Sequence, residues 1–540
     1  MTGVGGPTTS AWPTTYSTGG LVASVDHLAS AAGAQLLAAG GSAADAAIAA
    51  SAVLAVTSPH YCGIGGDLFA LVHDGTGPPE VLDAAGRAGS GADPRRLRDA
   101  GHTSIPVRGD VAAAPVPGCV DGWVELHARF GRRPFAEVLA PAVRLAADGF
   151  PTAPILSFML HTLEVTDGCD ELTSVRPEPG ERLVRPELAA TLAAIAEQGR
   201  DGFYGGRFGR ALVELGAGEY SDEDLAESQA RWVEPLGLRV WGHDLWTPPP
   251  TSQGYLAITS ARIAELCGLA PDDRLDPSDP AWVHLLVEVS RLAGHDREDV
   301  LHDRADGAAL LDDARLRARA ARFDPDGLSG VRGPDAGGGT MYLCAVDASG
   351  MGVSLIQSNA KDFGCHVAVP GTGVLLHNRG IGFTLEPGHP AEYGPRRRPP
   401  HTLAPALITR SDGTLRAVLG TMGGDSQPQV VLQMAARLIV EGQEAGDVID
   451  APRFVLAPGA GSEGTGFDTW SDVAAQVVRV EAHAPQAWSS GLQRLGHSVE
   501  LAGVDPAGFG HAQLIEVRGD GVLAGAADPR SMSGAAVAAP

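Results

Sequence analysis

The sequence predicts a mixed α+β fold, and three observations carry that prediction. Residues 42–56 are an alanine-rich run that stops before Ser58-Pro59, which is typical of a capped helix. Residues 340–347 and 351–359 are two β-like runs separated by three residues, which indicates an antiparallel hairpin. The 71 glycines and 39 prolines show no period of three, so they point to many turns. Because 540 residues exceed what one hydrophobic core usually supports, we expect two domains or one large layered domain.

The other elements continue this mixture of helices and hairpins. Two further hairpins are predicted over 68–72 with 81–82, behind a glycine loop at 63–66, and over 406–409 with 415–419, around Asp412-Gly413. Two further helices are predicted over 133–151 and from Asp425 or Ser426 to Gly442, with Pro428 in the first turn.

Composition excludes several classes of protein. With 44% hydrophobic and 19% charged residues the chain is globular, and its net charge of −25 argues against nucleic acid and anionic membranes as partners. No apolar run approaches the roughly 20 residues of a membrane span. The first charged residue, Asp26, comes too late for a signal peptide, so we expect a cytoplasmic protein.

No metal site or cofactor is predicted. The cysteines are scattered without a C-x-x-C pair, which argues against zinc and a disulfide framework and favours buried free thiols. The glycine loop at 63–66 follows a helix and precedes a strand, the reverse of the dinucleotide fingerprint. The six cysteines are Cys62, Cys119, Cys169, Cys267, Cys344 and Cys365.

The residues with a possible catalytic role gather around one threonine. The chain has no G-x-S-x-G elbow and no H-E-x-x-H, but Thr340 follows three glycines and opens a strand. Cleavage before Thr340 would give it both a hydroxyl nucleophile and an α-amino group, which titrates near roughly pH 8 and can act as the base. If Asp347 faces Met351, Thr340 lies across from Ser358, although a bulge at Gly350 would shift this by one.

A second candidate is the pair Gly423 and Gly424, which lies between a strand and a helix N-terminus. Backbone N–H groups in that position can stabilise an oxyanion. From the sequence pattern alone, Thr340 can also be a threonine that only opens a strand, and the glycine pair can be only a turn.

Taken together, the motifs resemble the γ-glutamyltranspeptidase family of N-terminal-nucleophile hydrolases nearly end to end. The segments that carry the resemblance are Gly40-Gly41-Ser42-Ala43-Ala44-Asp45-Ala46-Ala47, Ser58-Pro59-His60, Gly63-Ile64-Gly65-Gly66, Val116-Pro117-Gly118, Leu139-Ala140-Pro141-Ala142, Pro248-Pro249-Pro250-Thr251-Ser252-Gln253-Gly254, Val369-Pro370-Gly371-Thr372-Gly373, Gly423-Gly424, Ala451-Pro452-Arg453 and Asp528-Pro529-Arg530.

The resemblance implies a four-layer αββα sandwich and a proenzyme that cuts itself before Thr340. A large subunit, residues 1–339, and a small catalytic subunit, residues 340–540, would then share one composite domain. The partners it implies are a small-molecule amide substrate and the two subunits themselves, and whether such pairs dimerise stays open.

The resemblance also assigns roles to single residues. Thr340 corresponds to the nucleophile, Ser358 to its supporting hydroxyl, and Gly423 with Gly424 to the oxyanion hole. Arg87 falls where the family places the arginine that grips the substrate carboxylate, and a guanidinium is the natural bidentate partner of that group.

Other positions depart from the family pattern. Gly382 stands where an aspartate holds the α-amino group of γ-glutamyl substrates, and His401-Thr402 replaces the paired serines that help bind the carboxylate. Met341 and Ala360 replace a threonine and an asparagine. The chain therefore resembles a branch that includes oxamate amidohydrolases and cephalosporin-acylase-like enzymes.

The expected function is an autoprocessed hydrolase or acyltransferase that cleaves an amide of a carboxylate-bearing substrate, with γ-glutamyl amides such as glutathione as the family default. The alternatives are an amidohydrolase of a small acid amide such as oxamate, an acylase, and an enzyme that cleaves carbon–carbon bonds. A non-catalytic, unprocessed scaffold is a further alternative, which Thr340, Ser358 and the glycine pair argue against.

Overall fold

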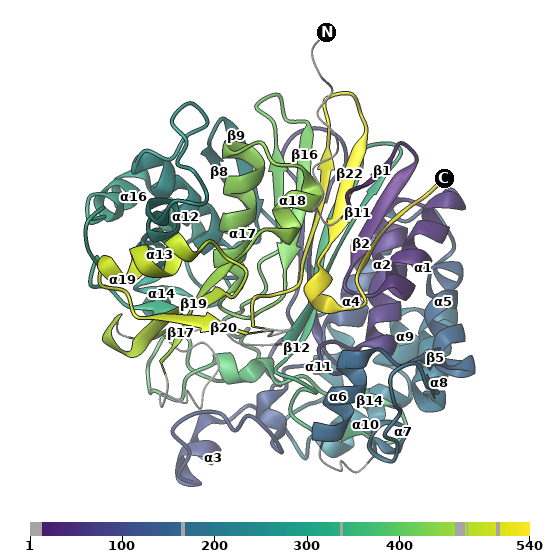
Figure 1. Cartoon of the computed structure of the whole chain (residues 1–540). Helices are drawn as coiled ribbons and strands as arrows, with labels where there is room; N and C mark the ends of the chain where they lie inside the picture. The colour runs from purple at the N-terminus through teal and green to yellow at the C-terminus, as the bar shows by residue number, and fades with distance from the viewer. Residues whose placement is uncertain (1–12, 164–167, 335–338, 460–469, 472, 504–507) are drawn as a thin grey trace.

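The protein is built around two seven-stranded antiparallel sheets packed face to face (Figure 1). The computed structural model describes residues 13–163, 168–334, 339–459, 470–471, 473–503 and 508–540. In the first sheet the order is β23 (Ala535–Ala538), β2 (Gly20–Ser24), β11 (Gly339–Asp347), β12 (Gly352–Ala360), β3 (Asp67–His73), β4 (Glu80–Ala84) and β7 (Arg231–Val233). In the second it is β1 (Thr15–Ser17), β22 (Leu523–Ala527), β21 (Ala512–Val517), β16 (Leu415–Thr421), β15 (Ala406–Thr409), β9 (His243–Thr247) and β8 (Leu236–Val240).

Helices cover the outer face of each sheet, on the right and on the left of Figure 1. The first sheet is covered by α1 (His27–Ala38), α2 (Ala43–Thr57) and α4 (Cys119–Phe130); α5 (Phe135–Asp148) packs on α2, and α8 (Pro186–Gln198) packs on α5. The second is covered by α12 (Tyr255–Leu266), α17 (Gln427–Ala435) and α18 (Ala445–Asp450), and α13 (Pro280–Gly294) packs on α12 and α17.

Smaller elements lie around these layers. The shorter helices are α3 (Pro94–Asp99), α6 (Pro154–Thr162), α7 (Asp170–Thr173), α9 (Arg200–Phe203), α10 (Arg207–Leu215), α11 (Asp222–Ala226), α14 (Arg297–Val300), α15 (Gly307–Leu310), α16 (Asp313–Ala320) and α19 (Gln486–Arg494), with 3₁₀ turns η1 (Val111–Ala113), η2 (Arg379–Gly382), η4 (Val473–Ala475) and η5 (Pro529–Ser531). The small sheets are β5 (Phe150–Pro151) with β6 (Arg182–Leu183), β10 (Gly333–Pro334) with β18 (Trp470–Ser471), β13 (Ala368–Val369) with β14 (Val374–Leu375), and β17 (Phe454–Pro458) with β19 (Gln476–Glu481) and β20 (Val499–Ala502).

Side chains of β11 alternate between two hydrophobic layers. Tyr342 and Val346 pack between the two sheets, whereas Met341, Leu343 and Ala345 pack against the helices of the first layer. A strand that is buried on both faces needs a layer on each side, and this arrangement confirms the predicted αββα sandwich.

The predicted elements are present, with shifts at their ends. In α2, Ser42 and Asp45 form a capping box as their spacing predicts. Helix α5 is shorter than the predicted 133–151, because Pro134 has an extended ψ of 135° at its N-cap and Gly149 has φ +91° at its C-cap. Helix α17 begins at Gln427 and continues as a π-helical segment, η3 (Ala436–Val440), before Gly442.

The hairpin register is also confirmed over most of its length. Met341 faces Gln357 and Val346 faces Gly352, in agreement with the predicted pairing. The irregularity lies at the open end, between Gly339 and Met341, and not at Gly350.

Both sheets contain strands from the two halves of the chain. Strand β2 lies between β23 and β11, and β3 pairs with β12, so the first sheet mixes strands that precede and follow Thr340. In the second sheet, β1 pairs with β22 and β9 with β15. The two predicted subunits would therefore share every layer of strands.

Candidate active site

Thr340 and Ser358 meet at the open end of the β11–β12 hairpin. The two hydroxyl oxygens lie 3.1 Å apart, and both residues are buried. The Ser358 hydroxyl donates to the carbonyl of Gly339 (2.8 Å) and accepts from the amide of Ala360 (2.7 Å). Because a serine has one hydroxyl proton, Thr340 is the donor in its bond with Ser358.

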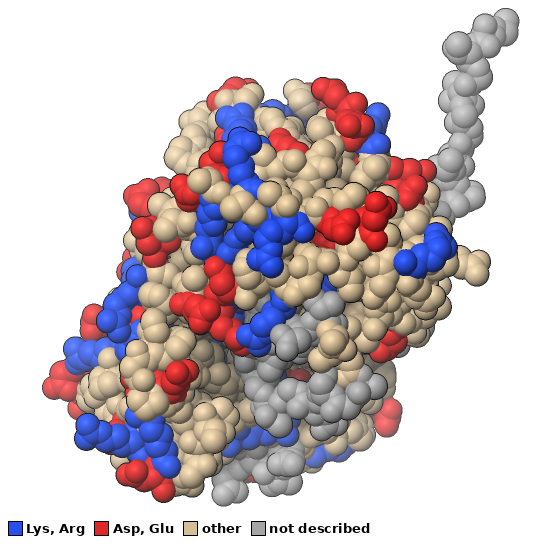
Figure 2. Space-filling model, turned by 90° about the vertical axis from the view of Figure 1, so that its left-hand side faces the viewer, with Lys and Arg blue, Asp and Glu red and all other residues tan. Residues whose placement is uncertain are grey.

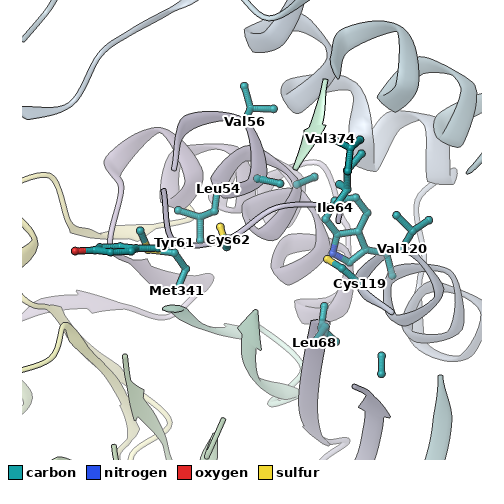
Figure 3. Close-up of a cluster of buried hydrophobic side chains, with 14 of the residues drawn as sticks. Leu54, Val56, Tyr61, Cys62, Ile64, Leu68, Cys119, Val120, Met341 and Val374 are labelled. Atoms are coloured by element: carbon teal, nitrogen blue, oxygen red, sulfur yellow. The ribbon is translucent and has the colours of Figure 1, made fainter. Parts of the chain in front are cut away.

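The residues on either side of Thr340 fix its position. A side chain at Gly339 would begin only 2.5 Å from Cδ1 of Tyr61, so this place requires glycine. Met341 and Tyr61 belong to one hydrophobic cluster with Leu54 and Cys62, as Figure 3 shows. The nucleophile candidate is thus held between a tight glycine and a side chain packed into the helical layer.

Gly423 and Gly424 form the turn between β16 and α17. Their φ values of +126° and +57° lie in the region that favours glycine, and a Cβ on Gly423 would come within 2.3 Å of Ser426 Oγ. Their place relative to Thr340 follows from packing: Leu415, at the start of β16, lies against Gly352 at the closed end of the β11–β12 hairpin, and Gly420, near the end of β16, lies against the ring of Tyr342. The turn and Thr340 therefore lie at the same end of the sandwich.

A glutamine from the large half of the chain supports this turn. The amide group of Gln253 donates to the carbonyls of Gly424 (3.1 Å) and Thr402 (3.2 Å), and its oxygen accepts from Arg297 Nε (2.9 Å). Arg297 also lies 3.6 Å from Asp425. Gln253 belongs to one of the sequence motifs but had no assigned role, whereas Arg297 gave no signal in the sequence.

His401 and Thr402 lie deep in the molecule. Nε2 of His401 is 2.7 Å from Oδ2 of Asp67, and its side chain is fully buried. Burial, together with the charge of Arg379, lowers the pKa of His401 to about 4, so this imidazole is neutral. The Thr402 hydroxyl is buried and has no hydrogen-bond partner among the residues that the structure describes.

Asp67 has three basic side chains around it. Besides His401, its Oδ2 lies 3.4 Å from Nδ1 of His377 and 3.5 Å from Nε of Arg379. Burial alone would raise the pKa of Asp67, but these three neighbours hold it well below its usual range. Only His401 of this cluster is also a candidate from the sequence, because the members come from distant segments of the chain.

Arg87 follows β4, and its guanidinium already has partners within the protein. It donates to Glu227 Oε1 (2.5 Å), to Gln229 Oε1 (3.3 Å) and to the carbonyl of Ser228 (3.1 Å). These residues lead into β7, the strand on the far side of β4 from β11. The structure therefore does not bring Arg87 into contact with Thr340, and a substrate carboxylate would compete with Glu227.

Gly382 ends the 3₁₀ turn η2, which follows β14 and begins at Arg379. Asp362 and Glu386 are two carboxylates from neighbouring loops that could take the place of the missing aspartate, and the carboxylate of Asp362 lies 3.6 Å from Arg108.

Comparison with known proteins agrees with this geometry. A family model described as gamma-glutamyltranspeptidase matches residues 29–538. The chain belongs to this family. It is 35% identical over 540 residues to an oxamate amidohydrolase proenzyme of Klebsiella pneumoniae, covering 96% of this chain and 98% of that protein. It is also 35% identical over 537 residues to a glutathione hydrolase-like YwrD proenzyme of Bacillus subtilis, with the same coverage.

A solved structure supports the same assignment. The cephalosporin acylase from Bacillus halodurans superposes with a TM-score of 0.87 at 30% identity, covering 99% of this chain and 98% of that one. The chain is thus an amidohydrolase of the gamma-glutamyltranspeptidase family, in the divergent branch that its motifs indicate.

Further features of this family member concern metals, thiols and surface charge. Within the described ranges no group of three His, Cys, Asp or Glu side chains could hold a metal ion, and no helix is long and apolar enough to cross a membrane. All six cysteines are free thiols, and all but Cys267 are buried, as expected. On the face drawn in Figure 2, basic and acidic side chains intermingle, and ion pairs such as Arg317 with Asp313 occur along α16.

Proposed function

We propose that this protein is a proenzyme that cuts itself between Gly339 and Thr340 and then uses Thr340 as the nucleophile of an amide-cleaving hydrolase or acyltransferase. One observation carries the proposal. The Ser358 hydroxyl donates to the carbonyl of the bond to be cut and accepts from the hydroxyl that would attack it.

Self-cleavage begins with attack of Thr340 Oγ1 on the carbonyl carbon of Gly339. An ester forms, the C–N bond breaks, and the nitrogen takes up a proton to become the amine of Thr340. Water then hydrolyses the ester, leaving a carboxylate on Gly339 and the free hydroxyl and amine of Thr340. The donor on the Gly339 carbonyl stabilises negative charge that develops during attack.

In substrate turnover, Thr340 attacks the amide carbonyl of the substrate in place of its own peptide bond. The Thr340 amine takes the hydroxyl proton, Oγ1 forms an ester with the acyl group, and the proton passes to the departing amine. Water or an acceptor amine then releases the acyl group. Backbone N–H groups of Gly423 and Gly424, held in place through Gln253, stabilise the tetrahedral oxyanion.

The substrate in this proposal is an amide that carries a carboxylate. Arg87, His401 and Thr402 are the binding candidates, with Arg87 as the cation and the Thr402 hydroxyl as a donor in need of an acceptor. γ-Glutamyl amides such as glutathione are the first class to test. A small acid amide such as oxamate is the second, favoured by Gly382 and by the oxamate amidohydrolase relative; an acylase activity is the third, after the structural neighbour.

The two-subunit organisation and a cytoplasmic location belong to the same proposal. Residues 1–339 and 340–540 would remain together as one composite domain, because each of the two large sheets contains strands of both.

A denaturing gel and N-terminal sequencing test the first step. The purified protein should give two bands, the smaller one beginning at Thr340, and Thr340→Ala should remain a single inactive chain. A single band in the native protein would favour the scaffold alternative, and a fragment that begins elsewhere would remove Thr340 from its role. Release assays over glutathione, oxamate and an acylated amine then distinguish the substrate classes.

A further inference from the structure

Three neighbouring strands place Thr340, Ser358 and Asp67 in one row. Thr340 and Ser358 are in hydroxyl contact across β11 and β12, and Ser358 faces Asp67 across β12 and β3. Opposed residues of an antiparallel pair project on the same face of the sheet. Moving two positions toward the closed end of the β11–β12 hairpin gives Tyr342, Ile356 and Phe69 on the same three strands. These three side chains all pack between the sheets. The row therefore faces the interior between the two sheets.

The Asp67 carboxylate is balanced by one permanent charge. Arg379 Nε lies 3.5 Å away, and both side chains are fully buried. His401 contributes no charge: its Nδ1 accepts from the amide of Leu403 (3.3 Å), so the proton is on Nε2 and is donated to Asp67. His377 donates from Nε2 to the carbonyl of Pro115 (2.8 Å), which connects the cluster to the large half of the chain.

The Asp67–Arg379 pair is close enough to Thr340 to influence a charge on its amino group. Neighbouring strands lie about 4.8 Å apart, so Asp67 lies roughly 10 Å from Thr340, two strands away. At an effective dielectric constant of about 20, a unit charge at that distance shifts the titration of an amine by about one pH unit. An uncompensated Asp67 would favour the ammonium form, which cannot act as the base, and an uncompensated Arg379 would favour the free amine.

We propose that Arg379 and Asp67 are a charge-positioning pair that sets the protonation state of the Thr340 amino group. This inference rests on the proposed function, in which that amine is the catalytic base. Arg379 cancels the field of Asp67, and the carboxylate holds Arg379 and His401 in the wall of the site. Neither residue touches the reacting atoms in this assignment; both act through the Thr340 amine.

Other ionisable groups lie around the same end of the sandwich and remain unchanged in the variants below. They are His60 and Tyr61 before β3, Lys361 and Asp362 after β12, Asp425 with Arg297, His377 and His401 of the cluster, and His511 before β21. Differences between variants therefore report the Asp67–Arg379 pair.

The test is the pH dependence of kcat/KM, whose acid limb reports the base of the free enzyme. In processed Arg379→Gln, the acid limb should move to higher pH by about one unit, and in Asp67→Asn to lower pH by about one unit. Arg379→Lys, which keeps the charge, should restore the native limb, and the double variant Asp67→Asn/Arg379→Gln should return it close to the native position. Shifts of opposite sign follow from charge and not from loss of structure.

A matched control exists in the outer helical layer. Glu288 and Arg291 of α13 form another buried carboxylate–guanidinium pair, and Glu288→Gln should leave the acid limb in place. An unmoved limb in folded Arg379→Gln, or shifts of the same sign in both single variants, would overturn the inference. If Arg379→Gln does not accumulate as processed protein, Asp67→Asn decides alone. Failure of the proposed function is distinguishable, because Thr340→Ala would then be active.

Discussion

Replacing Ser358 by alanine should slow self-cleavage far more than it weakens the fold. The Ser358 hydroxyl is the donor on the carbonyl of Gly339, where negative charge develops. Loss of one such donor typically slows the chemical step by about 10²–10³-fold, or about 3–4 kcal/mol of activation free energy. The same substitution leaves the buried amide of Ala360 without its acceptor, which should lower the free energy of unfolding by about 1–3 kcal/mol.

The full-length chain is made by cell-free translation, and its conversion into two fragments is followed over time on a denaturing gel. Ser354→Ala is the matched control, because Ser354 lies on the same strand and face and its hydroxyl bonds Tyr342 Oη (2.9 Å) but not Thr340. Ser354→Ala should cleave at the native rate. If Ser358→Ala matured within tenfold of the native rate, the hydroxyl would have no part in the cleavage step.

Three further predictions concern recognition and stability. Arg87→Ala should lower kcat/KM on the best carboxylate-bearing amide by at least tenfold, whereas Glu227→Gln, which removes an exposed competing carboxylate, should lower KM by up to about fivefold. If kcat/KM and KM in both variants equal those of the native enzyme, the substrate carboxylate binds elsewhere. With Gly382 in the amino-binding place, the preference for γ-glutamyl-p-nitroanilide over glutaryl-p-nitroanilide should stay below about a hundredfold in kcat/KM, and a larger ratio would reveal an amino-binding group. Buried Asp528 has a pKa lowered to about 2 by Arg453 and Arg530, against the cost of burial, so its contribution to stability is complete above about pH 4 and is lost as the pH falls toward 2. Asp528→Asn should flatten that acid decline, on the order of 2 kcal/mol, in denaturant titrations, and an unchanged slope would contradict it.

Local features of this molecule could be predicted from the sequence. The capping box of α2 and the β11–β12 register depend on residues within a few positions of one another, so their spacing suffices. The juxtaposition of Thr340 and Ser358 follows from that register alone. The irregularity next to Gly339 has no such local signal, because the neighbour that crowds this position, Tyr61, is distant in sequence.

The long-range features could not be predicted in this way. Asp67, Arg379 and His401 come from a strand, a 3₁₀ turn and a loop, and only the folded sandwich brings them together. The partners of Arg87 lie about 140 positions further along the chain, so no local pattern shows that its guanidinium is already engaged. Charges of this kind are recognisable only once the strand order is known.

The presence of strands from both halves of the chain in each sheet has a consequence for how such an enzyme can be made. Strand β2 has β11 on one side and β23 on the other, so a large subunit synthesised by itself would leave both edges of β2 without hydrogen-bond partners. Strand edges without partners are templates for pairing with other chains and so promote aggregation. Two genes encoding the two subunits separately are therefore a poor route to active protein, and translation as one polypeptide, cut only after assembly of the sheets, supplies each edge with its neighbour at the correct stoichiometry.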